Sequence, residues 1–297
     1  MTAPAVQPGE FESLRVLHVS DLHFGPPAVP EVVDAIDAHI QEACYDVVAV
    51  SGDITQRTRS GEFQRGMVFL RDARKVSRVI VVPGNHDIAW WRSPLYVRGS
   101  ECIYEPYRRF IGQELEPVLR MPGATFVGIN TAQGVSLRTL TWNLRDISII
   151  GDLRPEQLER ARAAFAASPP DDLRAVVMHH NPIKGELSQR HGLKHSAWVL
   201  EEFARMGVEL VLCGHDHQEA VHYLERLGDG IVVSTAGTVS DRSRGGRPPS
   251  VNALVIQRGW IEARTFLWSA VERTLVEGAR YRFARRVASQ RQNQVRG

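Results

Sequence analysis

The chain has 297 residues, 43% of them apolar, with a formal net charge of +2 and three cysteines. This composition excludes a disordered or fibrous protein and is typical of one large layered domain. The three unpatterned cysteines favour neither a disulfide framework nor a thiolate metal site, and no apolar stretch approaches the roughly 20 residues of a membrane helix. Because the first residues lack a signal-peptide pattern, we expect a cytoplasmic location.

The N-terminal third alternates between short apolar runs and amphipathic segments. Strands are predicted at 14–20, 46–51 and 78–82, with helices near 30–43 and 61–73 between them. Strands that alternate with helices in this way indicate βαβ units, in which consecutive strands run parallel in one sheet.

The segment 88–122 interrupts this alternation and is rich in aromatic residues and arginine. It begins directly after Gly84-Asn85-His86-Asp87, so we expect an insertion that lies near and covers the functional site. Trp90 in this segment is a candidate to stack on a substrate, and packing inside the insertion is the alternative explanation for it.

The second half changes character along its length. Strand-like runs at 124–130 and 146–150 precede a helix that begins near Pro155, and residues 219–267 have the alternating pattern of antiparallel strands. The final 18 residues carry six arginines and no acid. We therefore predict a basic tail, which could be a nucleic-acid or membrane-surface arm, a docking helix or a solvated end.

Five of the predicted strands end directly before side chains of the types that bind metal ions. These strand ends are Asp21-Leu22-His23, Gly52-Asp53, Gly84-Asn85-His86-Asp87, His179-His180 and Gly214-His215-Asp216-His217. Each alone would be read as a turn or a helix cap. Because open α/β sheets place their ligand sites at the carboxyl ends of strands, their shared placement predicts one site.

The order of these motifs resembles the calcineurin-like metallophosphoesterases across roughly residues 14–265. Among these, stretches such as "HVSDLHFG", "VVPGNHD" and "VSTAGTVSDRSRGGRP" are most similar to the bacterial class III cyclic nucleotide phosphodiesterases. The resemblance implies an α/β fold, a four-layer αββα sandwich of two mixed β-sheets flanked by helices. We accordingly expect a catalytic domain at 1–270, which includes the insertion at 88–122, and the basic tail at 271–297.

Hydrolysis of a phosphate ester at neutral pH needs a strong nucleophile and positive charge beside the phosphoryl and leaving oxygens. Two divalent cations that share a carboxylate meet both needs, because both acidify the water held between them. Asp53 is the candidate bridge, and the expected reaction is attack by the bridging hydroxide. Mixed imidazole and oxygen ligands suit manganese, iron and zinc alike, whereas four histidines disfavour magnesium.

The resemblance also implies how two metal ions would share the ligands. The first ion would take Asp21, His23, Asp53 and His217, and the second would take Asp53, Asn85, His179 and His215.

Three further histidine and aspartate roles follow from the same motifs. The resemblance implies that His86 protonates or stabilises the leaving oxygen, with Asp87 orienting its imidazole. Either His179 or His180 can reach the metal after the strand. The register favours His179, which leaves His180 as a substrate contact or as a hydrogen-bond donor behind the ligands.

We therefore predict a dinuclear metal-dependent phosphodiesterase for small diesters such as 3′,5′-cyclic nucleotides, with Arg242 as a candidate phosphate or ribose contact. One alternative is a nuclease or a broad-specificity phosphomonoesterase, and another is a non-catalytic metal-binding scaffold. Without its six terminal arginines the chain would carry a net charge of −4, which disfavours a nucleic-acid partner. A homo-oligomer is left open.

Overall fold

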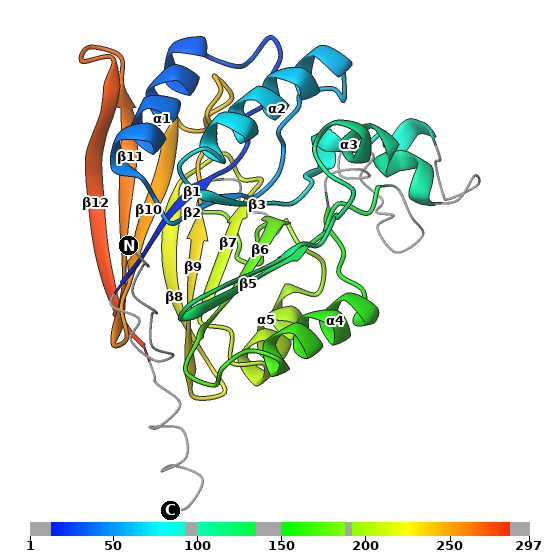
Figure 1. The fold of residues 1–297 in the computed structure, drawn as a ribbon, viewed down its shortest axis with the longest axis vertical. Coiled ribbons are helices and arrows are strands. Elements are labelled where there is room, and N and C mark those ends of the chain that lie inside the picture. Colours follow the sequence, from blue (N-terminus) through cyan, green and yellow to red (C-terminus); the bar gives the residue numbers. More distant parts are fainter. Residues whose placement is uncertain (1–12, 93–99, 135–149, 188–191, 286–297) are drawn as a thin grey trace, which may run out of the picture.

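The computed structural model describes residues 13–92, 100–134, 150–187 and 192–285. Two six-stranded sheets pack face to face, and helices cover the outer face of each sheet (Figure 1). The strand order is β12-β11-β10-β1-β2-β3 in the first sheet and β4-β5-β6-β7-β9-β8 in the second. The predicted four-layer αββα sandwich is therefore confirmed.

The first sheet combines a parallel half and an antiparallel half. Its parallel strands are β1 (Leu14–Val19), β2 (Val47–Val50) and β3 (Arg78–Val81), and the helices between them are α1 (Pro30–Ala43) and α2 (Ser60–Ala73). Helix α1 begins at Pro30 and buries Val32, Ile36 and Ile40, which lie four residues apart on one face. The antiparallel strands are β10 (Ser250–Ile256), β11 (Trp260–Ser269) and β12 (Thr274–Ala284).

The second sheet is parallel at its centre and antiparallel at its edges. Its strands are β4 (Val118–Met121), β5 (Ala124–Ile129), β6 (Leu173–His180), β7 (Leu210–Gly214), β8 (Ala220–Arg226) and β9 (Asp229–Thr235). Strands β4 and β8 run antiparallel to their neighbours β5 and β9. Helices α4 (Pro155–Ala166) and α5 (Ser196–Arg205) cover the outer face (Figure 1).

The space between the two sheets is apolar except for a small polar cluster around His18. Apolar side chains from both sheets form the core, including Val16, Phe126 and Val177. His18 is fully buried and lies 3.1 Å from Ser234 Oγ and 2.9 Å from Ser51 Oγ. Burial lowers the pKa of His18 to about 3. His18 is thus a neutral core residue whose two ring nitrogens both have hydrogen-bond partners, as expected from its place inside a strand.

The insertion contributes short helices beside the first sheet. These are η2 (Trp90–Arg92), η4 (Ser100–Tyr104) and α3 (Glu105–Phe110), and they follow η1 (Asn85–Asp87). Helix α3 contacts α2, and Tyr107 Oη donates a hydrogen bond of 3.4 Å to the carbonyl oxygen of Val81 in β3. Residues 93–99 lie outside the described part, so covering of the site stays a prediction.

The predicted tail at 271–297 is wrong as far as residue 285. Strand β12 pairs with β11 along its whole length, from the pair Ser269 and Thr274 to the pair Trp260 and Ala284. Arg285 then makes a buried ion pair with Glu209, the residue before β7 of the other sheet. The strand escaped recognition because most of its side chains are exposed on both faces, as is usual at a sheet edge, so no apolar alternation marks it. Residues 286–297 lie outside the described residues.

Two further features of the fold bear on the predictions from sequence. The expected strand at 146–150 falls almost entirely outside the described residues. Within the described ranges, no helix has both the length and the apolar character needed to cross a bilayer.

Candidate metal centre

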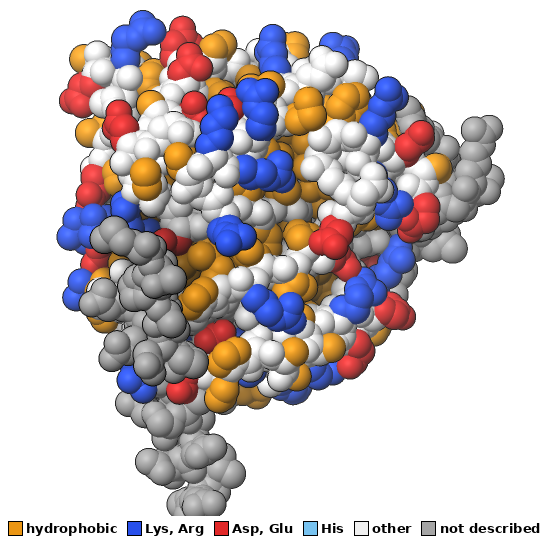
Figure 2. Space-filling model, viewed as in Figure 1, with side chains coloured by type: hydrophobic (Ala, Val, Ile, Leu, Met, Phe, Trp, Pro, Cys, Tyr) orange, Lys and Arg blue, Asp and Glu red, His pale blue; other side chains and the backbone are white. Residues whose placement is uncertain are grey.

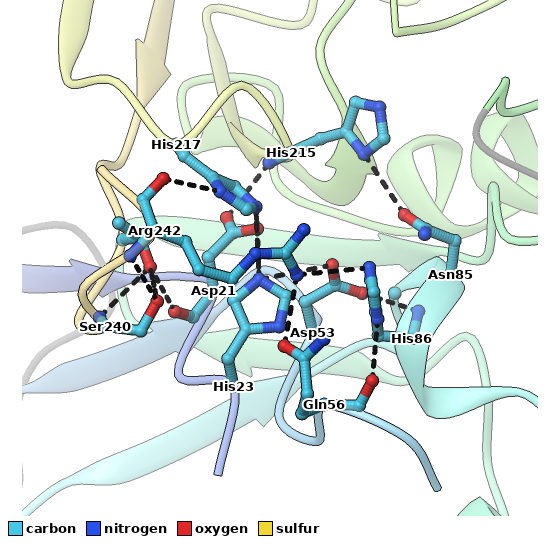
Figure 3. Close-up of polar contacts among 12 residues, drawn as sticks. Asp21, His23, Asp53, Gln56, Asn85, His86, His215, His217, Ser240 and Arg242 are labelled. Carbon is cyan, nitrogen blue, oxygen red and sulfur yellow. Dashed lines mark hydrogen bonds and ion pairs between the residues drawn. The ribbon is translucent and has the colours of Figure 1, made fainter. Parts of the chain in front are cut away.

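The five strand ends identified in the sequence meet at one edge of the sandwich. Asp21 and His23 follow β1, Asp53 follows β2, Asn85 follows β3, His179 lies at the end of β6, and His215 and His217 follow β7. Backbone hydrogen bonds tie the first two loops together, from Asp21 N to Gly52 O and from His23 N to Asp53 O. In Figure 3 the side chains of His23, Asp53 and His217 point toward one another, and His215 points toward Asn85.

The first group of side chains contains Asp21, His23, Asp53 and His217. The Nε2 atoms of His23 and His217 are 3.1 Å apart, and Asp21 Oδ1 lies 3.1 Å from His217 Nε2. Asp53 Oδ2 lies 3.7 Å from His23 Nε2. All four residues are buried, and one nitrogen or oxygen atom of each lies within 4.8 Å of the others.

The second group contains Asn85, His179 and His215. Asn85 Oδ1 lies 3.1 Å from His179 Nε2 and 3.1 Å from His215 Nδ1, and these two nitrogens are 3.3 Å apart. Asp53 Oδ2 is 3.3 Å from His179 Nε2. The same carboxylate oxygen therefore lies between the two groups.

Divalent cations fit this arrangement of atoms. Asp21 Oδ1 and Asp53 Oδ2 are buried and accept no hydrogen bond of good geometry among the described residues, and their near neighbours are imidazole nitrogens of His217 and His179. Two buried carboxylate oxygens left in this way are costly unless a positive charge faces them. Imidazole nitrogens and carboxylate and amide oxygens in two adjoining groups make a set suited to two metal ions.

His179 and His180 have different surroundings. His179 Nδ1 donates a hydrogen bond of 2.8 Å to the carbonyl oxygen of Ser51, which turns Nε2 toward Asn85 and Asp53. His180 Nδ1 lies 2.8 Å from Thr131 Oγ1, and one of its ring nitrogens is within 4.8 Å of nitrogens of His179 and His215. Only His179 contacts both Asn85 and Asp53 in the hydrogen bonds and ion pairs of the described residues.

Five of the seven predicted ligands have left-handed backbone conformations. Their φ angles are 53° at Asp21, 45° at His23, 52° at Asp53, 73° at His215 and 55° at His217. A non-glycine residue in this region costs of order 1 to 3 kcal/mol and persists only where the surroundings enforce it. The chain turns sharply at these points, which brings ligands from short loops to the same place.

Two glycines allow the loops to approach each other closely. A Cβ atom on Gly84 would lie 2.1 Å from Asp53 Oδ1, and one on Gly214 would lie 1.9 Å from Ser20 Oγ. No side chain fits at either position without displacement of the neighbouring loop. The glycines that precede Asn85 and His215 are therefore part of the packing that aligns the ligands.

Charge in the metal-free site is shared between carboxylates and one imidazole. Burial alone would lower the pKa of His179, but the Asp53 carboxylate outweighs it and raises that pKa to about 9. Burial would raise the pKa of Asp53, but His179 and His86 hold it well below its usual range. Burial together with the neighbouring His179 lowers the pKa of His215 to about 3. At neutral pH, His179 is thus an imidazolium ion beside ionised Asp53.

His86 lies beside the first group with one ring nitrogen held by the backbone. Its Nδ1 donates a hydrogen bond of 2.8 Å to the carbonyl oxygen of Gln56, and its backbone N–H donates to Asp53 Oδ1 at 2.8 Å. The rings of His86 and His23 meet edge to face with 4.9 Å between their centroids. This leaves His86 Nε2 as the atom that faces the centre.

Arg242 reaches the centre from the loop between β9 and β10. Its backbone carbonyl oxygen lies 3.2 Å from His217 Nδ1, and its Nη1 donates a hydrogen bond of 3.0 Å to Gln56 Oε1. The same Nη1 is 3.5 Å from His86 Nε2 (Figure 3).

Comparison with known proteins decides the family. The model of the calcineurin-like phosphoesterases matches residues 14–219, which contain the seven predicted metal ligands and His86 but not Arg242. The chain belongs to the calcineurin-like phosphoesterase family. The family prediction is confirmed, whereas the placement with the class III cyclic nucleotide enzymes stays a prediction. No curated protein sequence matches this chain.

Solved structures share the fold of this chain at low sequence identity. The purple acid phosphatase PPD1 of yellow lupin (Lupinus luteus) superposes with a TM-score of 0.67 at 12% identity, over 94% of this chain and 55% of the lupin chain. PhoD has a TM-score of 0.64 at 10% identity, over 94% of this chain and 71% of its own. Plasmodium GAP50, described as the anchor in the inner membrane complex, has a TM-score of 0.55 at 13% identity, over 93% and 90%.

Asp87 contacts the backbone of neighbouring loops, whereas the Nδ1 atom of His86 contacts the carbonyl oxygen of Gln56. The Asp87 carboxylate accepts hydrogen bonds from the backbone N–H groups of Ile54, Thr55 and Gly84, at 3.1, 2.8 and 2.9 Å. Burial and the charge of Asp53 raise the pKa of Asp87 to about 6. Asp87 therefore ties the loops after β2 and β3 together, and the carbonyl of Gln56 orients His86.

Gln56 is the functional residue that sequence reasoning missed. Its backbone carbonyl accepts from His86 and its side-chain oxygen accepts from Arg242. A carbonyl carries no sequence signature. The position of Gln56 three residues after Asp53 was the available hint.

Trp90 packs away from the two groups of ligands. It lies against a small apolar cluster formed by Ile88, Ile103, Tyr104 and Ala132. This supports the alternative that Trp90 packs the insertion. A cavity of about 580 Å³ lies nearby between the insertion and α4, and none of the predicted metal ligands lines it.

Proposed function

We propose that this chain is a dinuclear metal-dependent phosphodiesterase that hydrolyses small phosphodiesters. The observation that carries the proposal is the position of Asp53 Oδ2, which lies 3.7 Å from His23 Nε2 of one group and 3.3 Å from His179 Nε2 of the other. A carboxylate oxygen between two groups of imidazoles is suited to join two cations.

The seven predicted ligands divide between two sites. Asp21, His23 and His217 would hold one cation, Asn85, His179 and His215 would hold the other, and Asp53 would serve both. Bound there, manganese, iron or zinc ions would supply Lewis acidity toward the phosphate and acidify a water molecule. His180 lies behind the second site against Thr131 or contacts the substrate.

His86 is the group that donates a proton to the leaving oxygen. Because Gln56 fixes Nδ1–H, only Nε2 can exchange a proton with the substrate. The carbonyl also prevents the ring from turning away, so the proton is delivered at a fixed position beside Asp53.

The charge of the site favours a phosphodiester monoanion. Asp21 and Asp53 are ionised because their pKa values lie well below the usual range, so two divalent cations leave the site positive. On the face in Figure 2, Lys and Arg side chains are interspersed with Asp and Glu rather than gathered in one basic patch. A mixed surface of this kind supports a small diester over a long nucleic acid. The motif resemblance supports 3′,5′-cyclic nucleotides as the first substrates to test.

The experiment compares substrates on protein stripped of metal and reloaded with Mn²⁺, Fe²⁺ or Zn²⁺. We expect bis(p-nitrophenyl) phosphate and 3′,5′-cyclic AMP to be cleaved faster than p-nitrophenyl phosphate and single-stranded DNA. Faster cleavage of p-nitrophenyl phosphate would indicate a phosphomonoesterase, and faster cleavage of DNA would indicate a nuclease. Absence of turnover in protein that holds two metal ions would favour a non-catalytic scaffold.

A further variant isolates the role of His86. We expect His86→Gln to slow cleavage of cyclic AMP, which has a poor leaving group, far more than cleavage of the nitrophenyl diester, whose leaving group needs no proton. His39→Gln is the matched control, because His39 lies on α1 with its Nε2 against Tyr45 Oη. Equal losses on both substrates would contradict proton donation by His86.

A further inference from the structure

We propose that Arg242 Nη1 and His86 Nε2 together hold one oxygen of the substrate phosphate, so that Arg242 sets the affinity of this enzyme for phosphate. The proposal rests on the proposed function and adds to it a group that is not a metal ligand. Three features of the structure support it: the distance between the two nitrogens, the hydrogen bonds that anchor the loop carrying Arg242, and the place of that loop in the chain.

The two nitrogens are spaced for a shared acceptor. They lie 3.5 Å apart, and an N–H···O hydrogen bond spans about 2.9 Å between heavy atoms, so one oxygen can accept from Arg242 Nη1 and from the proton that His86 carries on Nε2 for the leaving group. Guanidinium groups donate and never accept, and they bind phosphate oxygens strongly. A phosphate oxygen between the two groups would replace a long contact of 3.5 Å by two short ones.

Gln56 holds both partners in position. Its side-chain oxygen accepts from Arg242 Nη1 at 3.0 Å, and its carbonyl accepts from His86 Nδ1 at 2.8 Å. One residue therefore fixes the distance between the guanidinium and the imidazole before a ligand arrives. Such preorganisation lowers the entropic cost of binding.

The loop that carries Arg242 is fastened to the first metal-binding loop. Thr238 Oγ1 and Val239 N both donate to the carbonyl oxygen of Asp21, at 2.8 and 3.2 Å. Asp241 N donates to the carbonyl oxygen of Pro27 at 2.9 Å. Because these bonds run to the segment after β1, the guanidinium has a fixed position relative to Asp21 and His217.

The position of Arg242 in the chain makes it a candidate for specificity. The family model ends at residue 219, whereas Arg242 lies beyond it in the loop between β9 and β10. The metal-binding groups come from the matched region, and this positive charge comes from outside it. We therefore expect phosphate affinity to respond to this loop independently of metal binding.

The test measures binding of inorganic phosphate to metal-loaded protein by titration calorimetry, and its competitive inhibition of bis(p-nitrophenyl) phosphate hydrolysis. We expect Arg242→Gln to weaken both by about ten- to a hundredfold, as is usual when a hydrogen bond to a charged group is lost, with unchanged metal content. Arg242→Lys should recover part of the affinity, because it keeps the charge but not the planar fork. Arg244→Gln, on an exposed residue of the same loop, is the matched control and should bind phosphate like the wild type.

Each outcome decides the proposal. Wild-type affinity for phosphate in Arg242→Gln, with the wild type active, would overturn the role of Arg242 and leave the proposed function intact. An equal loss of phosphate affinity in Arg244→Gln would mean that only the overall charge of the loop matters, and this would also overturn the role of Arg242. A metal-loaded wild type that neither hydrolyses diesters nor binds phosphate would overturn the proposed function and this inference together.

Discussion

Ser51 and His179 are joined by a hydrogen bond of 2.8 Å between the serine carbonyl oxygen and the imidazole Nδ1. The hydroxyl oxygen of the same serine lies 2.9 Å from Nε2 of His18, which is buried between the two sheets. A chain of contacts therefore runs from the core of the sandwich to the metal centre. It fixes both the tautomer and the direction of the His179 ring, so that Nε2 is the nitrogen available to a cation.

Replacing the bridging carboxylate should remove metal and activity together. In Asp53→Asn the oxygen between the two groups loses its charge, so we expect the content of bound metal to fall below two ions per chain and kcat/KM to fall by about a thousandfold or more. Elemental analysis and diester hydrolysis measure the two effects. Asp34→Asn, on an exposed position of α1, should retain both. Two tightly held metal ions in Asp53→Asn would contradict the bridging role.

The close approach at Gly84 should make this position intolerant of a side chain. A Cβ atom there would lie 2.1 Å from Asp53 Oδ1 and 2.3 Å from Asp53 N. We expect Gly84→Ala to lower the free energy of unfolding by about 1 to 3 kcal/mol and to weaken metal binding, since the loop must shift. Gly61→Ala in α2 is the matched control, because nothing lies within 4 Å of its Cβ position and alanine is the better helix former. Urea unfolding compares the two variants.

Loading with metal should release a proton from the site. The pKa of His179 is about 9 in the metal-free protein, so its imidazole is protonated at pH 7.5 and must lose that proton to bind a cation. Metal affinity should therefore rise with pH and level off above about pH 9. Calorimetry in buffers of different ionisation enthalpy counts the proton, and we expect about one more in the wild type than in His179→Asn. Equal counts in the two proteins would contradict the assignment.

The same raised pKa predicts how the stability of the metal-free protein depends on pH. The folded protein holds the His179 proton more tightly than the unfolded chain, where the value is 6.5. This contribution is complete below pH 6.5 and disappears as the pH rises through 9. Between these values the free energy of unfolding of metal-free wild type should fall, and that of His179→Asn should change less.

The ion pair between Arg285 and Glu209 should anchor the end of the chain. Arg285 Nε and Nη2 donate to the two carboxylate oxygens of Glu209 at 3.0 and 3.1 Å, and both side chains are less than 10% exposed. We expect Arg285→Met to lower the free energy of unfolding by about 3 to 5 kcal/mol, because a buried carboxylate is left unpaired. The double variant Arg285→Met, Glu209→Leu should regain part of the loss. A loss below about 1 kcal/mol in the single variant would mean that this end is dispensable.

The sequence predicted the centre better than its surroundings. The predicted ligands Asp21, Asp53 and His215 could be identified because each is a residue of a metal-binding type that lies just after an apolar strand. The contact between Gln56 and His86 could not, because it uses a backbone carbonyl. The contacts of Asp87 could not be predicted either, because four backbone and hydroxyl donors from neighbouring loops surround it, and none has a sequence pattern.

The fold shows the same division. Strands β1, β2 and β3 and helices α1 and α2 were predicted within a few residues, because they bury an apolar face. Strand β12 was missed because it lies at the edge of its sheet with polar side chains such as Arg280 and Arg282 on its exposed surface. These residues form a strand because they pair with β11. Their own sequence has no pattern that predicts one.

The left-handed backbone at Asp21, His23, Asp53, His215 and His217 stores strain in the folded protein, so the placement of these predicted ligands lowers its stability. Glycine at any of these positions would relieve that strain. A descendant that no longer needs metal would therefore be expected to become more stable as it loses ligands, while the sandwich persists. Recruitment of this scaffold for purely structural tasks would then be thermodynamically downhill, and the return to catalysis would be the harder evolutionary step.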